Sequence, residues 1–510
     1  MNVFYNLARA ARSLPEHPAL IYEDQTLSYR VLHHRSLTFA AHLATLGVVA
    51  GDLVALFLPN VPAFVIAYHA AQALGAVPVS IGAMSTPREV TAVLDDCSPV
   101  ALVTHADLAN QLPELGPHAT KARICVGDET PECFEPWPNL TGERVVSPVD
   151  RQPHDPAAVL YTSGTTGEPK GVVLSQMNIV SNVASVALAQ GLKPTDRVLC
   201  FLPLFHCFGQ NHIVGGAIRA GATVVLQRRF DLDAVCEVVP RLGISCLYGV
   251  PTVYRRLLAH PGIDLALRPL RYSFSAAAAM DSATVVRWAE AFGQPIWEGY
   301  GLTETSPFAT YNHPLGYLAG TVGVPIDGVE VAIERDGVVS LEMGARGEVV
   351  VRGPNVMLGY LGRPSETQEA LRGGWFHTGD LGLMDERGAL TLVDRLKDMI
   401  NTAGFKVWPR EVEGVLSDGP GVAEVSVVGR PDPDRGEVVV AAIVPSVPGR
   451  FDPEALSSWA KERLAPYKRP QHFMVCEQLP ISPSGKVLRR VLRESAMTLK
   501  HPGLPHTDPL

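Results

Sequence analysis

The sequence lacks the cysteine spacing of a metal knuckle or a redox site. It contains eight cysteines, and no two of them stand at CxxC spacing. A zinc knuckle and a thioredoxin-type site are therefore not indicated. We expect reduced and mostly buried thiols in a cytoplasmic protein. The eight residues are Cys97, Cys125, Cys133, Cys200, Cys207, Cys236, Cys246 and Cys476.

The sequence also lacks an apolar run long enough to cross a membrane. Its most apolar stretch, residues 61–84, is interrupted by His69 and Gln72 and contains Pro62 and Pro78. The first residues contain no uninterrupted apolar segment, so we predict no signal peptide. For residues 61–84 we expect a buried or amphipathic helix followed by a strand, and we expect no integral membrane segment.

The sequence has no excess of basic residues. Lysine and arginine number 43 and aspartate and glutamate 52, which gives a formal net charge of −9. Nucleic acid is therefore not an expected partner, because a phosphate backbone favours a net basic face. With 46% hydrophobic and 19% charged residues over 510 positions, the composition is that of a globular chain of two unequal or three domains.

Strand and helix patterns alternate along the first part of the chain, which predicts an α/β fold with parallel sheets. Continuous apolar runs predict strands at 53–58, 76–80, 100–103, 197–202, 222–226 and 245–250. Helical spacing predicts helices at 31–46, 61–74 and 88–94.

The pattern changes around residue 320. Short strands at 329–333, 347–352 and 389–393 stand between glycine-rich turns and predict a compact β subdomain. Helices and strands mix again beyond residue 397. We therefore predict a large N-terminal domain, residues 1–396, and a smaller α+β C-terminal domain, residues 397–510, with a loose tail from about 497.

The strongest local signal is the segment YTSGTTGEPKG, residues 161–171, which follows an apolar run. Glycines let backbone N–H groups turn toward an anion, hydroxyls add donors, and Lys170 adds a positive charge. We predict a loop that binds phosphate, although the spacing is not that of the P-loop and a surface turn is the alternative. The predicted contacts are Thr162, Ser163, Gly164, Thr165, Thr166, Gly167 and Lys170.

Six further motifs follow this loop in order, at residues 202–209, 299–305, 375–380, 394–400, 404–413 and 483–486. Together with the loop, they resemble the AMP-forming adenylating superfamily of acyl-CoA synthetases, firefly-type luciferases and non-ribosomal peptide synthetase adenylation domains. The sequence looks most like the fatty-acid or aryl-acid CoA ligases.

The resemblance implies a reaction in two steps. A carboxylate attacks the α-phosphorus of ATP to give acyl-AMP and pyrophosphate, and CoA then takes the acyl group as a thioester. Because two anions must meet in the first step, the site needs cations and N–H donors. ATP, Mg²⁺ and coenzyme A are the expected cofactors, and a carboxylic acid and CoA are the expected partners.

The resemblance assigns the phosphate and adenine contacts to particular residues. Glu304 would bind Mg²⁺ together with Thr165, since both offer hard oxygen ligands. Thr303 would contact the α-phosphate, and Tyr300 would lie against the purine. Without the resemblance, a solvated glutamate and a buried core tyrosine would be the ordinary interpretations.

The remaining roles that the resemblance implies lie toward the C-terminus. Asp380 and Arg395 would bind the ribose hydroxyls. Lys486 would bridge the carboxylate and the α-phosphate, as a compact mobile charge can. Lys397 occupies the hinge position, about which the mobile C-terminal domain would rotate to admit the thiol. Gly404 would let pantetheine pass close to the backbone.

The acid pocket is predicted to be apolar. His206 resembles a gate between the ATP and acid sites and joins the predicted catalytic group, although an ionised acid needs no general base. No charged residue marks an amino-acid substrate, which favours a fatty or aromatic acid. Where relatives carry glycine, this sequence has alanine after Ser275, which would narrow the pocket. The predicted lining is Phe205, Phe208, Val250, Ala276, Ala277 and Pro307.

The sequence leaves other acceptors and acids open. The acyl group could pass to the pantetheine of a separate carrier protein, or the acid could be an unusual small one of a biosynthetic pathway. A homodimer is also compatible with the sequence. A non-catalytic nucleotide-binding relative is disfavoured, because Lys486 and Glu304 are both present.

Overall fold

A computed structural model of the chain describes residues 1–112, 122–163, 169–313, 317–342, 344–482 and 486–498. The chain forms two compact units. The first unit comprises residues 1–331 and 351–377, and the second comprises residues 332–350 and 378–510. Within the described ranges, no helix has both the length and the apolar character needed to cross a membrane.

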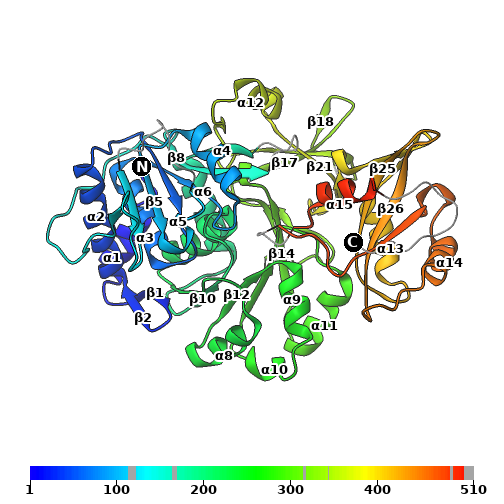
Figure 1. Ribbon diagram of the computed structural model, residues 1–510, viewed down its shortest axis with the longest axis horizontal. Helices are drawn as coiled ribbons and strands as arrows, with labels where there is room; N and C mark the ends of the chain where they lie inside the picture. The colour runs from blue at the N-terminus through cyan, green and yellow to red at the C-terminus, as the bar shows by residue number, and fades with distance from the viewer. Residues whose placement is uncertain (113–121, 164–168, 314–316, 343, 483–485, 499–510) are drawn as a thin grey trace. The chain divides into compact units, whose positions relative to one another are not determined.

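An eight-stranded sheet in the first unit carries the strands on either side of the glycine-rich loop (Figure 1). Its order is β20-β9-β8-β4-β3-β5-β6-β7, in which β3 to β8 run parallel and β9 and β20 pair antiparallel at one edge. The strands are β3 (Leu53–Phe57), β4 (Val77–Ser80), β5 (Ala101–His105), β6 (Ala122–Val126), β7 (Glu135–Pro136), β8 (Pro156–Ser163), β9 (Pro169–Ser175) and β20 (Gly359–Tyr360).

A nine-stranded sheet, β16-β15-β14-β13-β12-β10-β11-β1-β2, completes the first unit. Its central strands run parallel, while β2 at one end and β15 and β16 at the other pair antiparallel. The strands are β1 (Pro18–Tyr22), β2 (Gln25–Ser28), β10 (Arg197–Cys200), β11 (Thr223–Leu226), β12 (Cys246–Gly249), β13 (Tyr272–Ser275), β14 (Ile296–Gly301), β15 (Phe308–Tyr311) and β16 (Val324–Pro325).

The helices of the first unit follow from local sequence signals. Helix α4 begins at a capping box in which Thr86 and Glu89 satisfy each other's backbone N–H groups. Helix α3 is apolar and buried on nearly all sides, and it packs against α2 (Figure 1). The helices are α1 (Tyr5–Ser13), α2 (Tyr29–Thr45), α3 (Pro62–Leu74), α4 (Pro87–Cys97), α5 (Ala106–Ala109), α6 (Gln176–Ala189), η1 (Phe208–Gly215), α7 (Gly216–Ala220), α8 (Leu232–Leu242), α9 (Pro251–Leu258), α10 (Ile263–Ala266), α11 (Ser282–Phe292), η2 (Thr303–Thr305), α12 (Pro364–Ala370) and η3 (Arg372–Gly374).

Two five-stranded sheets build most of the second unit. One has the order β18-β17-β19-β21-β22, and the other has the order β24-β23-β26-β25 with β27 beside β26. The strands are β17 (Glu330–Arg335), β18 (Val338–Ser340), β19 (Arg346–Arg352), β21 (Phe376–Met384), β22 (Leu390–Arg395), β23 (Ile400–Thr402), β24 (Phe405–Val407), β25 (Val422–Asp432), β26 (Gly436–Pro445) and β27 (His472–Val475). The helices are η4 (Leu396–Asp398), α13 (Pro409–Ser417), α14 (Pro453–Arg463), η5 (Pro466–Lys468) and α15 (Arg489–Ala496).

Most elements predicted from the sequence are present. The buried helix and following strand predicted for residues 61–84 are α3 and β4, and the three predicted strands of the β subdomain are β17, β19 and β22. Six of the eight cysteines are buried, as predicted, while Cys133 is exposed and Cys236 partly exposed. Of the predicted loose tail, residues 499–510 lie outside the described residues.

Candidate functional site

The glycine-rich segment is built on a β-hairpin. Strands β8 and β9 pair antiparallel, with Thr162 opposite Lys170 and Ser163 opposite Pro169 at its end. A strand therefore runs into the loop, as the sequence predicted. The tip of the hairpin, with the predicted contacts Gly164, Thr165, Thr166 and Gly167, lies outside the described residues.

Tyr360 connects this hairpin to the predicted metal ligand. Its hydroxyl donates a hydrogen bond to Glu304 Oε1 at 3.0 Å, and Lys170 Nζ lies over its ring, 5.1 Å from the centroid. Burial, together with the charge of Glu304 and the hydrogen bond to it, raises the pKa of Tyr360. The hydroxyl therefore keeps its proton at neutral pH and acts as the donor.

The turn that holds Thr303 and Glu304 depends on tight backbone packing. Strand β14 ends in Gly299, Tyr300 and Gly301, and η2 follows at once. A side chain at Gly301 would collide with the Pro307 carbonyl oxygen, because an added Cβ would lie 1.7 Å from it. The glycines beside the predicted adenine contact are thus required by packing, and Tyr300 itself is buried.

A thiol joins two of the predicted catalytic residues. Cys207 Sγ donates to Thr303 Oγ1 at 3.6 Å and lies 3.8 Å from His206 Nδ1. Cys207 therefore lies between His206, its neighbour in the chain, and Thr303 in the first unit. The connecting role of Cys207 was not predicted from the sequence.

The predicted acid pocket is only partly assembled around one aromatic cluster. The buried Phe208 ring packs edge-on against Phe274 at 6.0 Å and against Phe308 at 5.7 Å between centroids. Phe205 lies against Gly82 instead, since a Cβ there would be 3.3 Å from its ring. Val250, Ala276 and Pro307 are buried, and Ala277 is half-buried.

Behind the aromatic cluster lies a buried polar network. Gln190 Nε2 approaches His212 Nε2 at 2.9 Å and also donates to the Tyr311 hydroxyl, while its carbonyl oxygen accepts from Tyr248. Burial lowers the pKa of His212 to about 3. The imidazole is therefore neutral, with Nε2 as the acceptor and the proton on Nδ1.

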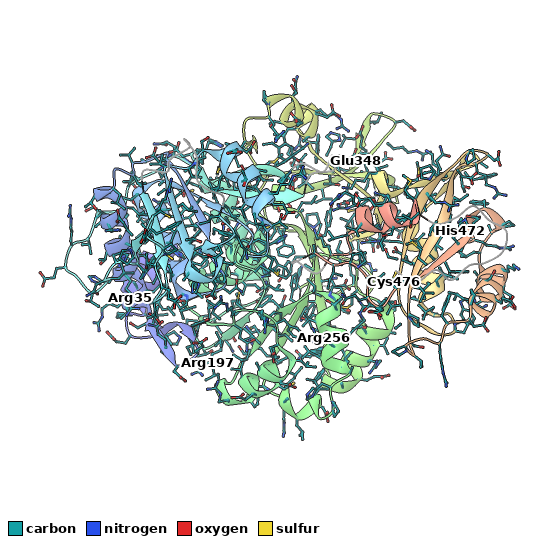
Figure 2. All side chains as sticks on the ribbon, in the orientation of Figure 1. Arg35, Arg197, Arg256, Glu348, His472 and Cys476 are labelled. Carbon is teal, nitrogen blue, oxygen red and sulfur yellow. The ribbon has the colours of Figure 1, made fainter. Side chains whose placement is uncertain are left out.

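The two predicted ribose contacts face each other in the second unit. Asp380 and Arg395 are directly opposite in the antiparallel pair β21–β22, and Arg395 Nε lies 2.7 Å from Asp380 Oδ1. Glu348, on β19 and labelled in Figure 2, accepts a hydrogen bond from the Gly379 backbone N–H at 2.8 Å and so supports β21 next to Asp380. Asp380 is buried, whereas 39% of the Arg395 side chain is exposed.

The predicted hinge residue, Lys397, lies in η4 next to this ion pair. Burial, with the positive charge of Arg395, lowers the pKa of Lys397. The residue that follows it, Asp398, accepts hydrogen bonds from Arg489 at 3.0 Å and Arg493 at 2.6 Å, both on α15. The segment that contains the predicted hinge is thus tied to the last helix of its own unit.

The other two predicted residues of the second unit are Lys486 and Gly404. The Lys486 backbone N–H donates to Ser482 Oγ at 3.0 Å, and the Ser482 N–H donates to the Lys486 carbonyl at 2.7 Å. Residues 483–485 between them lie outside the described residues. Ala403 and Gly404, with φ of 49° and 83°, form the two-residue turn between β23 and β24.

The structure therefore brings some of the predicted residues together: Lys170 and Glu304 through Tyr360 in the first unit, and Asp380 with Arg395 in the second. Within the first unit it adds Tyr360 and Cys207, which sequence reasoning missed because their partners are remote in the chain. The short segment Gly359–Tyr360 carries no local signal for a contact with Glu304, and only the pairing of β20 with β9 reveals it.

The comparisons with known proteins agree with the motifs. A model of the AMP-binding enzyme family matches residues 7–361, and a model of the AMP-binding enzyme C-terminal domain matches residues 411–486. The chain is 34% identical over 488 residues to feruloyl-CoA synthase of an Amycolatopsis species, which covers 95% of this chain and 97% of the relative. It is 31% identical over 524 residues to long-chain-fatty-acid–CoA ligase of Salmonella typhimurium, with 96% and 93% covered.

A solved structure shows the same agreement. The o-succinylbenzoate CoA synthetase of Bacillus subtilis, in complex with its acyl-adenylate intermediate, superimposes with a TM-score of 0.83 and 31% identity. The match covers 97% of this chain and 98% of that chain. The chain belongs to the AMP-binding enzyme family. The predicted family, fold class and enzyme class are thereby confirmed at the level of the family.

Proposed function

We propose that this protein is an AMP-forming acid–CoA ligase for an aromatic or fatty carboxylic acid. A carboxylate oxygen attacks the α-phosphorus of ATP, and pyrophosphate leaves with the electron pair of the broken P–O bond. The sulfur of CoA then attacks the acyl carbon, and AMP leaves. The observation that carries the proposal is the Lys170–Tyr360–Glu304 group at the stem of the phosphate loop, in a chain of this family.

The first unit would bind the triphosphate. Lys170 and the hydroxyls and N–H groups of residues 162–167 would offset the repulsion between the incoming carboxylate and the phosphates. Thr303 would contact the α-phosphate, and His206 would border the acid site. No general base is needed, because a carboxylic acid is already ionised at neutral pH.

The residues present fit a magnesium ion. Mg²⁺ prefers oxygen ligands and uses one or two carboxylates together with substrate phosphates. Glu304 supplies a buried carboxylate whose orientation is fixed by the Tyr360 hydroxyl. When bound there, with Thr165 as a further ligand, the ion would supply charge neutralisation of the phosphates.

The second unit would bind the ribose and complete the reaction. Asp380 would accept from the ribose hydroxyls beside Arg395, and Tyr300 of the first unit would lie against the adenine. Lys486 would bridge carboxylate and α-phosphate during adenylation. We further propose that rotation about Lys397, at the boundary between domains 1–396 and 397–510, withdraws this lysine and presents Gly404 to pantetheine.

The aromatic acid is the favoured substrate class. Phe208, Phe274 and Phe308 form an edge-to-face cluster beside the predicted pocket, an arrangement that suits a flat ring. Feruloyl-CoA synthase is among the relatives, and it is named for an aromatic acid.

The test is a panel of acids with the purified protein, Mg-ATP and CoA. Aromatic acids of the hydroxycinnamate class and long-chain fatty acids are compared by release of AMP and pyrophosphate and by mass spectrometry of the thioester. We expect at least one aromatic acid to give acyl-CoA. If no acid supports exchange of pyrophosphate into ATP, the proposal is rejected. Formation of acyl-AMP without consumption of CoA would instead favour a carrier-protein acceptor.

A further inference from the structure

Tyr360 contacts two residues to which the proposed function gives different roles, Glu304 as the ligand of Mg²⁺ and Lys170 as a contact of the phosphates. Its hydroxyl lies 3.0 Å from the Glu304 carboxylate, and its ring faces the Lys170 ammonium at 5.1 Å. One half-buried tyrosine therefore links the predicted metal ligand to the predicted phosphate-binding cation.

Strand pairing explains how this contact arises. Tyr360 stands opposite Val172 in the antiparallel pair of β20 and β9. Side chains alternate between the two faces of a strand, so Lys170, two residues before Val172, lies on the same face of the sheet as Val172 and Tyr360. Lys170 is therefore the diagonal neighbour of Tyr360 across the strand pair. A backbone contact brings Glu304 to the same strand. The Met357 N–H donates to the Glu304 carbonyl at 2.8 Å, and this hydrogen bond holds the segment that leads into β20 against η2.

We propose that Tyr360 is a positioning residue that orients Glu304 for the metal and Lys170 for the phosphates of ATP. This inference rests on the proposed function, since it assumes that Glu304 binds Mg²⁺ and Lys170 binds phosphate. A hydrogen bond to one oxygen of a metal-binding carboxylate holds the other oxygen in a fixed direction. Here Oε1 accepts from Tyr360, and Oε2 is the oxygen for the cation.

The ring has a separate effect on the lysine. An aromatic face attracts an ammonium group through its quadrupole and does not cancel its charge. A carboxylate in the same place would form an ion pair and compete with the phosphates. Tyr360 thus holds Lys170 in place and leaves its full positive charge to the nucleotide.

Two variants separate the two effects. Tyr360→Phe removes the hydroxyl and keeps the ring, whereas Tyr360→Leu removes both. Calorimetric titration with ATP, in Mg²⁺ and in EDTA, measures nucleotide binding without an acid and without turnover. For Tyr360→Phe we expect the gain in ATP affinity on adding Mg²⁺ to fall about 10- to 100-fold, with metal-free affinity unchanged. For Tyr360→Leu we expect metal-free ATP binding to weaken as well, by about two- to fivefold.

Tyr5→Phe is the matched control. The Tyr5 hydroxyl also donates to a carboxylate, Asp150 Oδ1 at 2.6 Å, in the same unit and away from the site. This variant should keep the parent's Mg²⁺ dependence. If Tyr360→Phe also keeps it while the parent binds Mg-ATP, the positioning role is overturned and the proposed function stands. If the parent itself does not bind Mg-ATP, both are overturned.

Discussion

At the scale of single residues, Ala277 holds a backbone conformation that disfavours a side chain. Its φ is 74°, in the left-handed region, which costs an L-residue roughly 1–2 kcal/mol relative to the right-handed one. The sequence predicted only that alanine here would narrow the acid pocket. The structure adds that this methyl group is kept at a cost in backbone strain, as is common near functional sites.

Replacing Ala277 with glycine should therefore stabilise the protein. We expect the free energy of unfolding to rise by up to about 1 kcal/mol, because relief of the strain exceeds the extra entropy of glycine in the unfolded chain. Denaturant unfolding of the parent protein and of Ala277→Gly measures this difference in the free energy of unfolding.

The neighbouring position supplies the control for this substitution. Ala278 is exposed and is not among the described residues with positive φ. Ala278→Gly should leave stability unchanged or lower it by about 0.5–1 kcal/mol. Equal effects of the two glycine substitutions would contradict the assignment of strain to Ala277.

At the scale of secondary-structure elements, one cluster of charges ties η4 to helices α13 and α15. Arg489 lies 2.7 Å from Glu413 Oε1 and 3.0 Å from Asp398 Oδ2. Burial opposes ionisation of Asp398, but the charges of Arg489 and Arg493 outweigh it and lower the pKa of Asp398. The cluster therefore holds α15 against the segment of the predicted hinge.

Removing Arg489 should destabilise the second unit strongly. Arg489→Leu would leave the partly buried Glu413 carboxylate without its cation and the buried Asp398 carboxylate with Arg493 alone, and breaking a buried ion pair in this way typically costs about 3–5 kcal/mol. The unfolding midpoint in urea, followed by tryptophan fluorescence and far-UV circular dichroism, measures the loss.

The adjacent Arg490 supplies the control for the Arg489→Leu substitution. It pairs with Glu494 one helical turn away, and 72% of its side chain is exposed. Because exposed pairs contribute little, Arg490→Leu should change stability by no more than about 0.5 kcal/mol. A similar loss of stability in both variants would show that the Arg489 cluster contributes no more to stability than an exposed ion pair.

At the scale of the whole molecule, the predicted residues are divided between the two compact units. Glu304 and Lys170 belong to the first, while Asp380 and Lys486 belong to the second. The proposed reaction needs both groups at the nucleotide during adenylation and only some of them during thioester formation. The two half-reactions should therefore respond differently to changes in the second unit.

Lys486→Ala should separate the half-reactions. We expect the rate of adenylation, measured as acid-dependent exchange of pyrophosphate into ATP, to fall by roughly 100-fold or more, since one charge facing the transition state is lost. Acyl-AMP supplied directly should still react with CoA to give the thioester. Lys461→Ala, at an exposed position of α14, should keep both activities. Loss of both half-reactions in Lys486→Ala would contradict the proposed division of roles.

The fold class could be predicted from the sequence because its signals are local, and local motifs also indicated the candidate site residues. Apolar runs marked the buried parallel strands, and helical spacing marked α2, α3 and α4. Glycines with hydroxyls and one lysine marked the phosphate loop. The contact of Tyr360 with Glu304 had no such signal, because the two residues are 56 positions apart.

The sequence by itself determined most of the elements that form and the chemical groups that are available: a glycine- and hydroxyl-rich segment with one lysine, a carboxylate at Glu304, the pair Asp380 and Arg395, and a lysine near the C-terminus. Only the tertiary structure decided which of these groups meet. The pairing of β20 with β9 placed Tyr360 between Lys170 and Glu304, and the register of β21 with β22 placed Asp380 opposite Arg395. The physical reason is that propensity and periodicity act over a few residues, whereas contacts between strands depend on how distant segments pack.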